Sequence, residues 1–199
     1  MAHIPDGILS LPVVAGGAAA CGAALWVSLR RLASEKVPHA AVLGAAFFVS
    51  STISFPVGPS SVHLMLSCVM GILLGSAVIP ALFVALLLQS IFFGLGGLLA
   101  LGVNTINIAV PALFAGSAFY WLKGRVSENA RALLAAPLAA MAVISTGALV
   151  FFSLLLSGSE YLPAAAVMMA TYLPLALLEA VIAVVIIRFL MKVAPEWLD

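Results

Sequence analysis

The stretch from Val62 to Leu122 contains no Lys, Arg, Asp or Glu, and this feature restricts the fold more than any other. A soluble domain is typically about 25% charged, whereas only 8% of these 199 residues are charged and 65% are hydrophobic. Lipid requires every backbone polar group to be satisfied internally, which leaves helices and closed barrels. Because the apolar runs are long and do not alternate, they exclude barrel strands. The sequence therefore predicts an all-α, polytopic integral membrane protein.

The apolar runs predict seven membrane spans in a single domain. A spanning helix needs about 17 to 25 residues, and breaks rich in proline, glycine or polar residues divide the chain at suitable intervals. The first ten residues, 1–10, precede the first span as a loop. The expected spans lie near 11–29, 40–55, 62–78, 80–97, 106–122, 132–156 and 163–190.

The basic residues predict the orientation of these spans. With seven spans and the amino terminus outside, every Lys and Arg falls on the cytoplasmic side, as the positive-inside rule requires. An even number of spans would place some of them on the wrong face. We therefore expect an inner-membrane protein with a cytoplasmic carboxyl terminus, surrounded by lipid and with no nucleic-acid partner. The eight basic residues are Arg30, Arg31, Lys36, Lys123, Arg125, Arg131, Arg188 and Lys192.

The first seven residues, 1–7, form the candidate metal-binding element. A free terminal amine close to His3 can chelate a divalent metal through the amine, backbone amide nitrogens and the imidazole. Nitrogen donors in one plane suit Ni(II) or Cu(II) better than the tetrahedral Zn(II). The turn sequence Pro5–Gly7 would fold this terminus back onto the following chain. His63 follows a proline- and glycine-rich loop on the same predicted outer face, so the two histidines are candidate joint ligands.

Polar residues within apolar segments are candidates for orienting these imidazoles, because metal-bound histidines usually have outer partners. Helix caps and interhelical hydrogen bonds would explain the same residues equally well, and Asp6 could simply form the turn. We expect Glu179, inside the last span, at mid-depth or in the inner half, away from His3, in a packing or partner contact. The candidate supporting residues are Asp6, Gln89, Asn104, Thr105 and Asn107.

Several motifs are missing from the sequence. No Gly-x-x-x-x-Gly-Lys-Ser/Thr loop is present, so the chain cannot hydrolyse ATP by that route. There is also no nucleophile elbow, no His-Glu-x-x-His motif and no pair of ionisable groups suited to acid–base catalysis on one face. These absences disfavour an intramembrane enzyme, and we expect no cofactor.

The motifs together resemble the CbiM/NikM family, the substrate-specific membrane components of energy-coupling-factor (ECF) transporters for nickel and cobalt. The resemblance extends over essentially the whole chain, and the Ile-Pro-Asp-Gly form of the first motif resembles the nickel branch. The segments that carry it are 3–7, 58–64, Gln89 with 96–97, 102–107, and 173–175 with Leu178 and Glu179.

This resemblance implies a square-planar site for Ni(II), made by the terminal amine, the second residue's amide nitrogen and imidazole, and a second histidine. Carried over, the imidazoles are those of His3 and His63. It also implies a coupling transmembrane (T) subunit, cytoplasmic ATPase subunits and a small accessory membrane subunit as partners. A cobalt importer subunit for cobalamin synthesis and a component for an organic vitamin remain alternatives.

The chain departs from the family pattern at its start, because Met-Ala-His replaces the usual Met-His. If Met1 is removed, Ala2 supplies the amine, His3 supplies an amide nitrogen and an imidazole, and His63 is the fourth donor. If Met1 stays, the terminus and His3 could fill the plane alone, with His63 displaced or axial. The sequence leaves both arrangements open.

Overall fold

The computed structural model describes residues 3–52, 54–57 and 60–198. Within this part, seven α-helices and one two-stranded hairpin follow one another along the chain, with three short 3-10 turns. The helices are α1 (Leu11–Arg30), α2 (Lys36–Ser50), α3 (Ser67–Leu74), α4 (Val78–Phe93), α5 (Leu101–Lys123), α6 (Glu128–Leu155) and α7 (Leu162–Val193). The strands are β1 (Ser54–Val57) and β2 (Ser60–His63), and the 3-10 turns are η1 (Gly75–Ala77), η2 (Ser159–Tyr161) and η3 (Pro195–Leu198).

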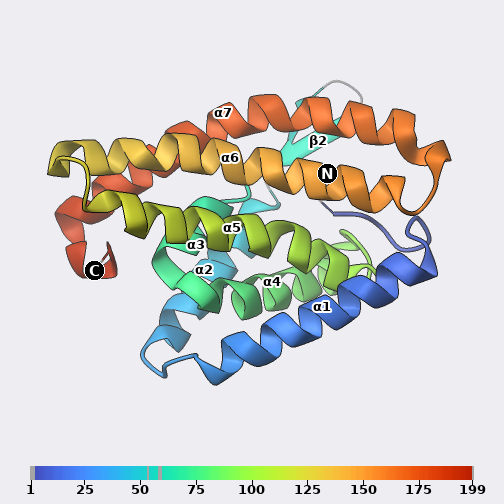
Figure 1. The fold of residues 1–199 in the computed structure, drawn as a ribbon, viewed down its shortest axis with the longest axis horizontal. Helices are drawn as coiled ribbons and strands as arrows, with labels where there is room; N and C mark the ends of the chain where they lie inside the picture. Colours follow the sequence, from blue (N-terminus) through green and yellow to red (C-terminus); the bar gives the residue numbers. More distant parts are fainter. Residues whose placement is uncertain (1–2, 53, 58–59, 199) are drawn as a thin grey trace.

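Helix α5 is the centre of the bundle. It packs against α1, α3, α4 and α6, while α6 and α7 lie side by side over most of their length (Figure 1). Helix α1 runs along the opposite edge and begins at Ser10, the N-cap, whose side chain makes no capping hydrogen bond. Proline in the first turn of α1 is compatible with a helix because its missing N–H would have no partner there.

Five helical segments in the described part of the chain are long and apolar enough to cross a membrane. They are α1, the continuous stretch Ser67–Phe93, α5, α6 and Ser159–Val193; α2 is shorter. This confirms the prediction of a multi-pass membrane protein. The all-α prediction holds for these segments, to which the structure adds the hairpin.

Several expected spans differ from the observed helices; those expected at 106–122 and 132–156 begin earlier, at Leu101 and Glu128. The span expected at 40–55 runs from Lys36 to Ser50 and gives way to β1, and the one expected at 80–97 runs from Val78 to Phe93. The span expected at 62–78 was wrong at its start, because residues 60–63 pair as a strand and helix α3 begins only at Ser67. A continuous apolar run does not distinguish a strand from a helix, which explains this error.

The basic residues gather at one end of the molecule. The carboxyl ends of α1, α5 and α7 and the amino ends of α2 and α6 lie on the left in Figure 1. All eight Lys and Arg residues belong to these helix ends or to the loops between them. The opposite end carries the start of α1, the 94–100 loop and the α6–α7 connection.

Candidate metal site

His3 and His63 meet inside the protein although sixty positions separate them. Their Nε2 atoms are 2.9 Å apart, and the rings stack with centroids 5.0 Å apart and 13° between the planes. His3 is 3% exposed and His63 is 5% exposed. Phe47 of α2 presents its ring perpendicular to that of His63, at 6.4 Å between centroids. The sequence prediction that these two histidines come together agrees with this geometry.

The hydrogen bonds of the pair define which ring nitrogens carry lone pairs. His63 Nδ1 lies 2.9 Å from the carbonyl oxygen of Leu64. A carbonyl can only accept, so His63 Nδ1 is the protonated nitrogen and its Nε2 has a free lone pair. His3 Nε2–H then donates to His63 Nε2. His3 Nδ1 keeps a lone pair that has no partner among the described residues, although it is buried.

The environment of His3 favours its neutral form. Burial, followed by the neighbouring His63, lowers the pKa of His3 from 6.5 to about 3. Since neutral imidazole is the form that ligates metals, the site favours a metal-competent His3 at neutral pH.

The segment that carries His3 is held by Asn104 of α5. The Ile4 N–H donates to Asn104 Oδ1 at 3.0 Å, and Asn104 Nδ2 donates to the Ile4 carbonyl at 3.0 Å. One side chain thus satisfies both backbone polar groups of a residue that is 1% exposed. Such groups are costly to leave unpaired when buried, so Asn104 fixes the backbone next to His3.

Asp6 and the glycines of the 94–100 loop complete this support. Asp6 Oδ1 accepts the N–H of Ala100, the N-cap residue of α5, at 3.0 Å. Gly97 lies against Asp6, and a Cβ there would collide with the Asp6 carboxylate and backbone nitrogen. Gly96 has φ +76°, and a Cβ there would lie 3.1 Å from His3 Cβ. The loop can approach the amino-terminal segment this closely only because these two residues lack side chains.

The other predicted supporting residues do not hydrogen-bond to the histidines. Thr105 Oγ1 donates to Leu101 within its own helix, and Asn107 donates to Ser153 of α6. Gln89 is fully buried, and neither polar atom of its side chain has a hydrogen-bond partner in the described part of the chain. Ala2 and Met1, the remaining predicted ligands, lie outside the described residues. The predicted supporting residues therefore act on the backbone beside His3 or on helix packing.

Glu179 makes a buried hydrogen-bonded contact, as the sequence predicted. Its carboxyl oxygens accept N–H groups from Met65 and Leu66, just after His63. These two partners were not predicted. The sequence contained one indication of a specific role for Glu179, namely a carboxyl group inside an apolar span.

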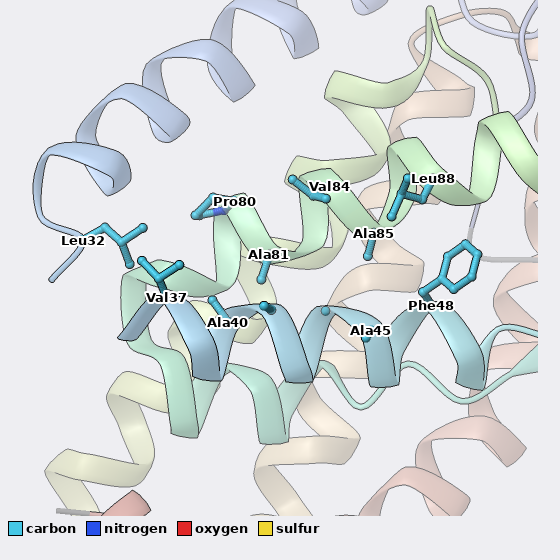
Figure 2. Close-up of a pocket in the computed structure, with 12 residues that line it drawn as sticks. Leu32, Val37, Ala40, Ala45, Phe48, Pro80, Ala81, Val84, Ala85 and Leu88 are labelled. Atoms are coloured by element: carbon cyan, nitrogen blue, oxygen red, sulfur yellow. The ribbon is translucent and has the colours of Figure 1, made fainter. Parts of the chain in front are cut away.

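A cavity of about 400 Å³ lies elsewhere, between α2 and α4 (Figure 2). Figure 2 shows Phe48 at one end and Leu32 with Val37 at the other. Phe48 is its one aromatic lining residue, and the rest are aliphatic, glycine or proline side chains. The cavity therefore offers no nitrogen or carboxylate ligand for a metal, and little aromatic surface for an organic ring.

The chain belongs to the family described as the cobalt uptake substrate-specific transmembrane region, CbiM, whose model matches residues 3–197. A protein of Haemophilus influenzae described as "Putative metal transport protein" is 40% identical over 98% of this chain and 95% of its own length. The fused nickel transport protein NikMN of Rhodobacter capsulatus is 36% identical over 74% of this chain, but that match covers only 45% of the fused protein. The cobalt transport protein CbiM of Lachnoclostridium phytofermentans is 29% identical over 90% of this chain and 74% of its own length.

Solved structures agree with these relatives. The crystal structure of a transition metal transporter has a TM-score of 0.82 and 28% identity, covering 96% of this chain and 93% of that one. A truncated transition metal transporter has a TM-score of 0.81 and 26% identity, with coverage of 96% and 98%. The chain is thus a membrane component of nickel or cobalt transport, and the resemblance read from its motifs is confirmed. The relatives named above are described as metal, nickel or cobalt transport proteins.

Proposed function

We propose that this chain is the substrate-binding membrane subunit of an ATP-driven ECF importer that takes up Ni(II). The observation that carries the proposal is the buried His3–His63 pair, in which the lone pair of His3 Nδ1 has no partner among the described residues. The packing of the two rings does not require His3 Nδ1 to stay without a hydrogen-bond donor. A metal ion supplies the missing partner for it.

The two imidazoles cannot complete a metal site alone. No cluster of three or more His, Cys, Asp or Glu side chains occurs in the described part of the chain. The remaining donors must come from backbone or terminal nitrogens, and we propose the amide of His3 and the amine of Ala2 once Met1 is removed. Donation from the His3 amide and imidazole Nδ1 closes a chelate ring within one residue. Four nitrogens in a plane favour Ni(II).

Seven crossings with the amino terminus outside fit the helix arrangement as follows. Helix α3 has eight residues and is about 12 Å long, too short to cross the roughly 30 Å hydrocarbon core. We propose that the hairpin β1–β2 and α3 together make the third crossing, with non-helical backbone buried in protein at membrane depth. The gathering of all basic residues at the other end supports a cytoplasmic position for that end.

The same proposal assigns the partners. A subunit that only binds the ion needs a source of energy, so a coupling T subunit, cytoplasmic ATPase subunits and a small accessory membrane subunit would complete the importer. Copurification of the chain with these subunits, followed by ATP-dependent nickel uptake into vesicles, tests this assignment. Metal binding by the isolated chain tests the site separately.

Nickel titration of the purified protein, with cobalt in competition, is the decisive experiment. We expect a yellow, diamagnetic nickel complex, as a square-planar nitrogen site produces, and an intact mass that lacks Met1. Tighter binding of cobalt would favour the cobalt alternative, which the family description and the cobalt transport relative support. Binding of neither ion would refute the proposed function.

A further inference from the structure

Glu179 of α7 contacts the backbone that leads away from His63. Its Oε1 accepts N–H groups from Met65 and Leu66, and its Oε2 lies 3.1 Å from the Leu66 nitrogen. Glu179 is 1% exposed and Met65 is 0% exposed. These bonds join parts of the chain more than one hundred residues apart, so they fix β2 and the start of α3 against α7.

The backbone at this point needs such support. Leu66 has φ 50° and ψ 15°, a left-handed conformation that is strained in a residue other than glycine. It is also the N-cap of α3, yet leucine has no side-chain acceptor for the free N–H groups at the helix start. Glu179 supplies the missing acceptor from another helix.

Holding Met65 and Leu66 also holds His63. Only Leu64 separates His63 from Met65, and His63 Nδ1 donates to the Leu64 carbonyl. The position of the Leu64 carbonyl decides which nitrogen of His63 is protonated and where its ring points. We infer that Glu179 is a positioning residue for metal binding, acting through the Met65–Leu66 backbone to keep the His63 imidazole aimed at the ion.

The inference rests on the proposed function, because it assigns Glu179 a role in the same nickel site. It also links the site to α7, whose carboxyl end, with Lys192 and the η3 turn, lies at the basic end of the molecule.

Replacement of Glu179 by leucine or by glutamine tests this role. Glu179→Leu removes both acceptors, whereas Glu179→Gln keeps one acceptor oxygen. Loss of groups that orient a metal-bound histidine typically weakens metal binding by about 10- to 100-fold, so we expect a loss in this range for leucine and a smaller one for glutamine. The matched control is Tyr172→Phe, also buried in α7, whose hydroxyl has no hydrogen-bond partner among the described residues.

A second readout separates positioning of His63 from a general loss of structure. Carbethoxylation of the metal-free full-length protein, followed by mass spectrometry, reports the accessibility of each imidazole. We expect His63 to react faster in both Glu179 variants, with the rate at His39 unchanged. If the leucine variant does not fold, the glutamine variant supports the same test with both readouts.

The outcomes distinguish this inference from the proposed function. If wild-type protein binds nickel and both variants bind it equally well, the positioning role of Glu179 is wrong and the proposed function stands. Weaker binding with unchanged reactivity at His63 would also overturn it, because Glu179 would then act elsewhere. If wild-type protein binds no nickel, the proposed function is wrong, and this inference, which rests on it, is wrong as well.

Discussion

The two histidines of the candidate site are held in different ways. His3 belongs to a short segment before α1, and neutral hydrogen bonds from Asn104, together with the Asp6 contact and the glycine loop, hold that segment down. His63 belongs to a hairpin between two helices and is braced by the Glu179 carboxyl group and the Phe47 ring. We therefore expect the His3 segment to detach more readily than the hairpin that carries His63, because it precedes the first helix and is not enclosed between two helices.

Removing each imidazole is the strongest way to sharpen this comparison. His3→Ala should lower nickel affinity by more than about 100-fold, beyond the range typical of supporting residues, because it removes a ligand and empties the docking position. His63→Ala should have a similar effect if Met1 is absent. Isothermal titration of both variants measures this, with His39→Ala as the control. Full nickel affinity in His63→Ala would show that the terminus and His3 fill the plane alone.

Asn104→Leu should have the next largest effect. It leaves the Ile4 N–H and carbonyl without partners, and each unsatisfied buried group costs about 1–3 kcal/mol. We expect the segment to detach and nickel affinity to fall by about 10-fold or more, while α5 stays intact. The adjacent Thr105→Val is the control, since the Thr105 hydroxyl bonds to Leu101 and to the Cys21 thiol and not to the His3 segment. Equal effects of the two substitutions would contradict a specific role for Asn104 in docking.

Gly97→Ala should weaken docking less. The added methyl group would overlap the Asp6 carboxylate, and overpacking of this kind costs about 1–3 kcal/mol. Nickel affinity should fall while the melting temperature of the bundle changes little. Gly124→Ala, where a Cβ meets nothing within 4 Å, is the control. An unchanged affinity would show that the loop yields to the methyl group.

Acid should loosen the metal-free site gradually. The pKa of His3 is about 3 when docked and 6.5 when free, so docking is fully favourable above about pH 6.5. Below pH 6.5, His3 in the free segment binds a proton, whereas docked His3 stays neutral down to about pH 3. The docked state therefore loses stability relative to the free state as the pH falls. The melting temperature, measured from pH 8 to pH 5, should decrease, and the decrease should be smaller in a variant lacking both histidines. If the melting temperature of that variant falls equally steeply with pH, the two histidines are not the cause of the decrease.

Much of this arrangement could be read from the sequence. The uncharged stretch and the basic residues predicted a multi-pass membrane protein, and the turn at Pro5–Gly7 led us to expect His3 beside His63. The hairpin could not be predicted, because proline and glycine marked residues 55–61 only as a break. The partners of Glu179 could not be predicted either, because its position along the last span does not show which loop lies beside it. A segment that enters the bundle between two helices changes which residues lie at the same height in the bundle. The spacing of apolar residues along the sequence does not show this.

The short helix α3 has a consequence for how the histidine pair connects to the basic end. Its two turns, about 12 Å long, are nearly all that separates the histidine pair from η1, which the Ser28 hydroxyl joins to the last turn of α1. On the His3 side the distance is longer, because α5 rises about 28 Å from Asn104, beside Ile4, to Lys123 at the basic end. The histidine pair is thus joined to the basic end by two unequal connections, a short one through α3 and a long one along α5.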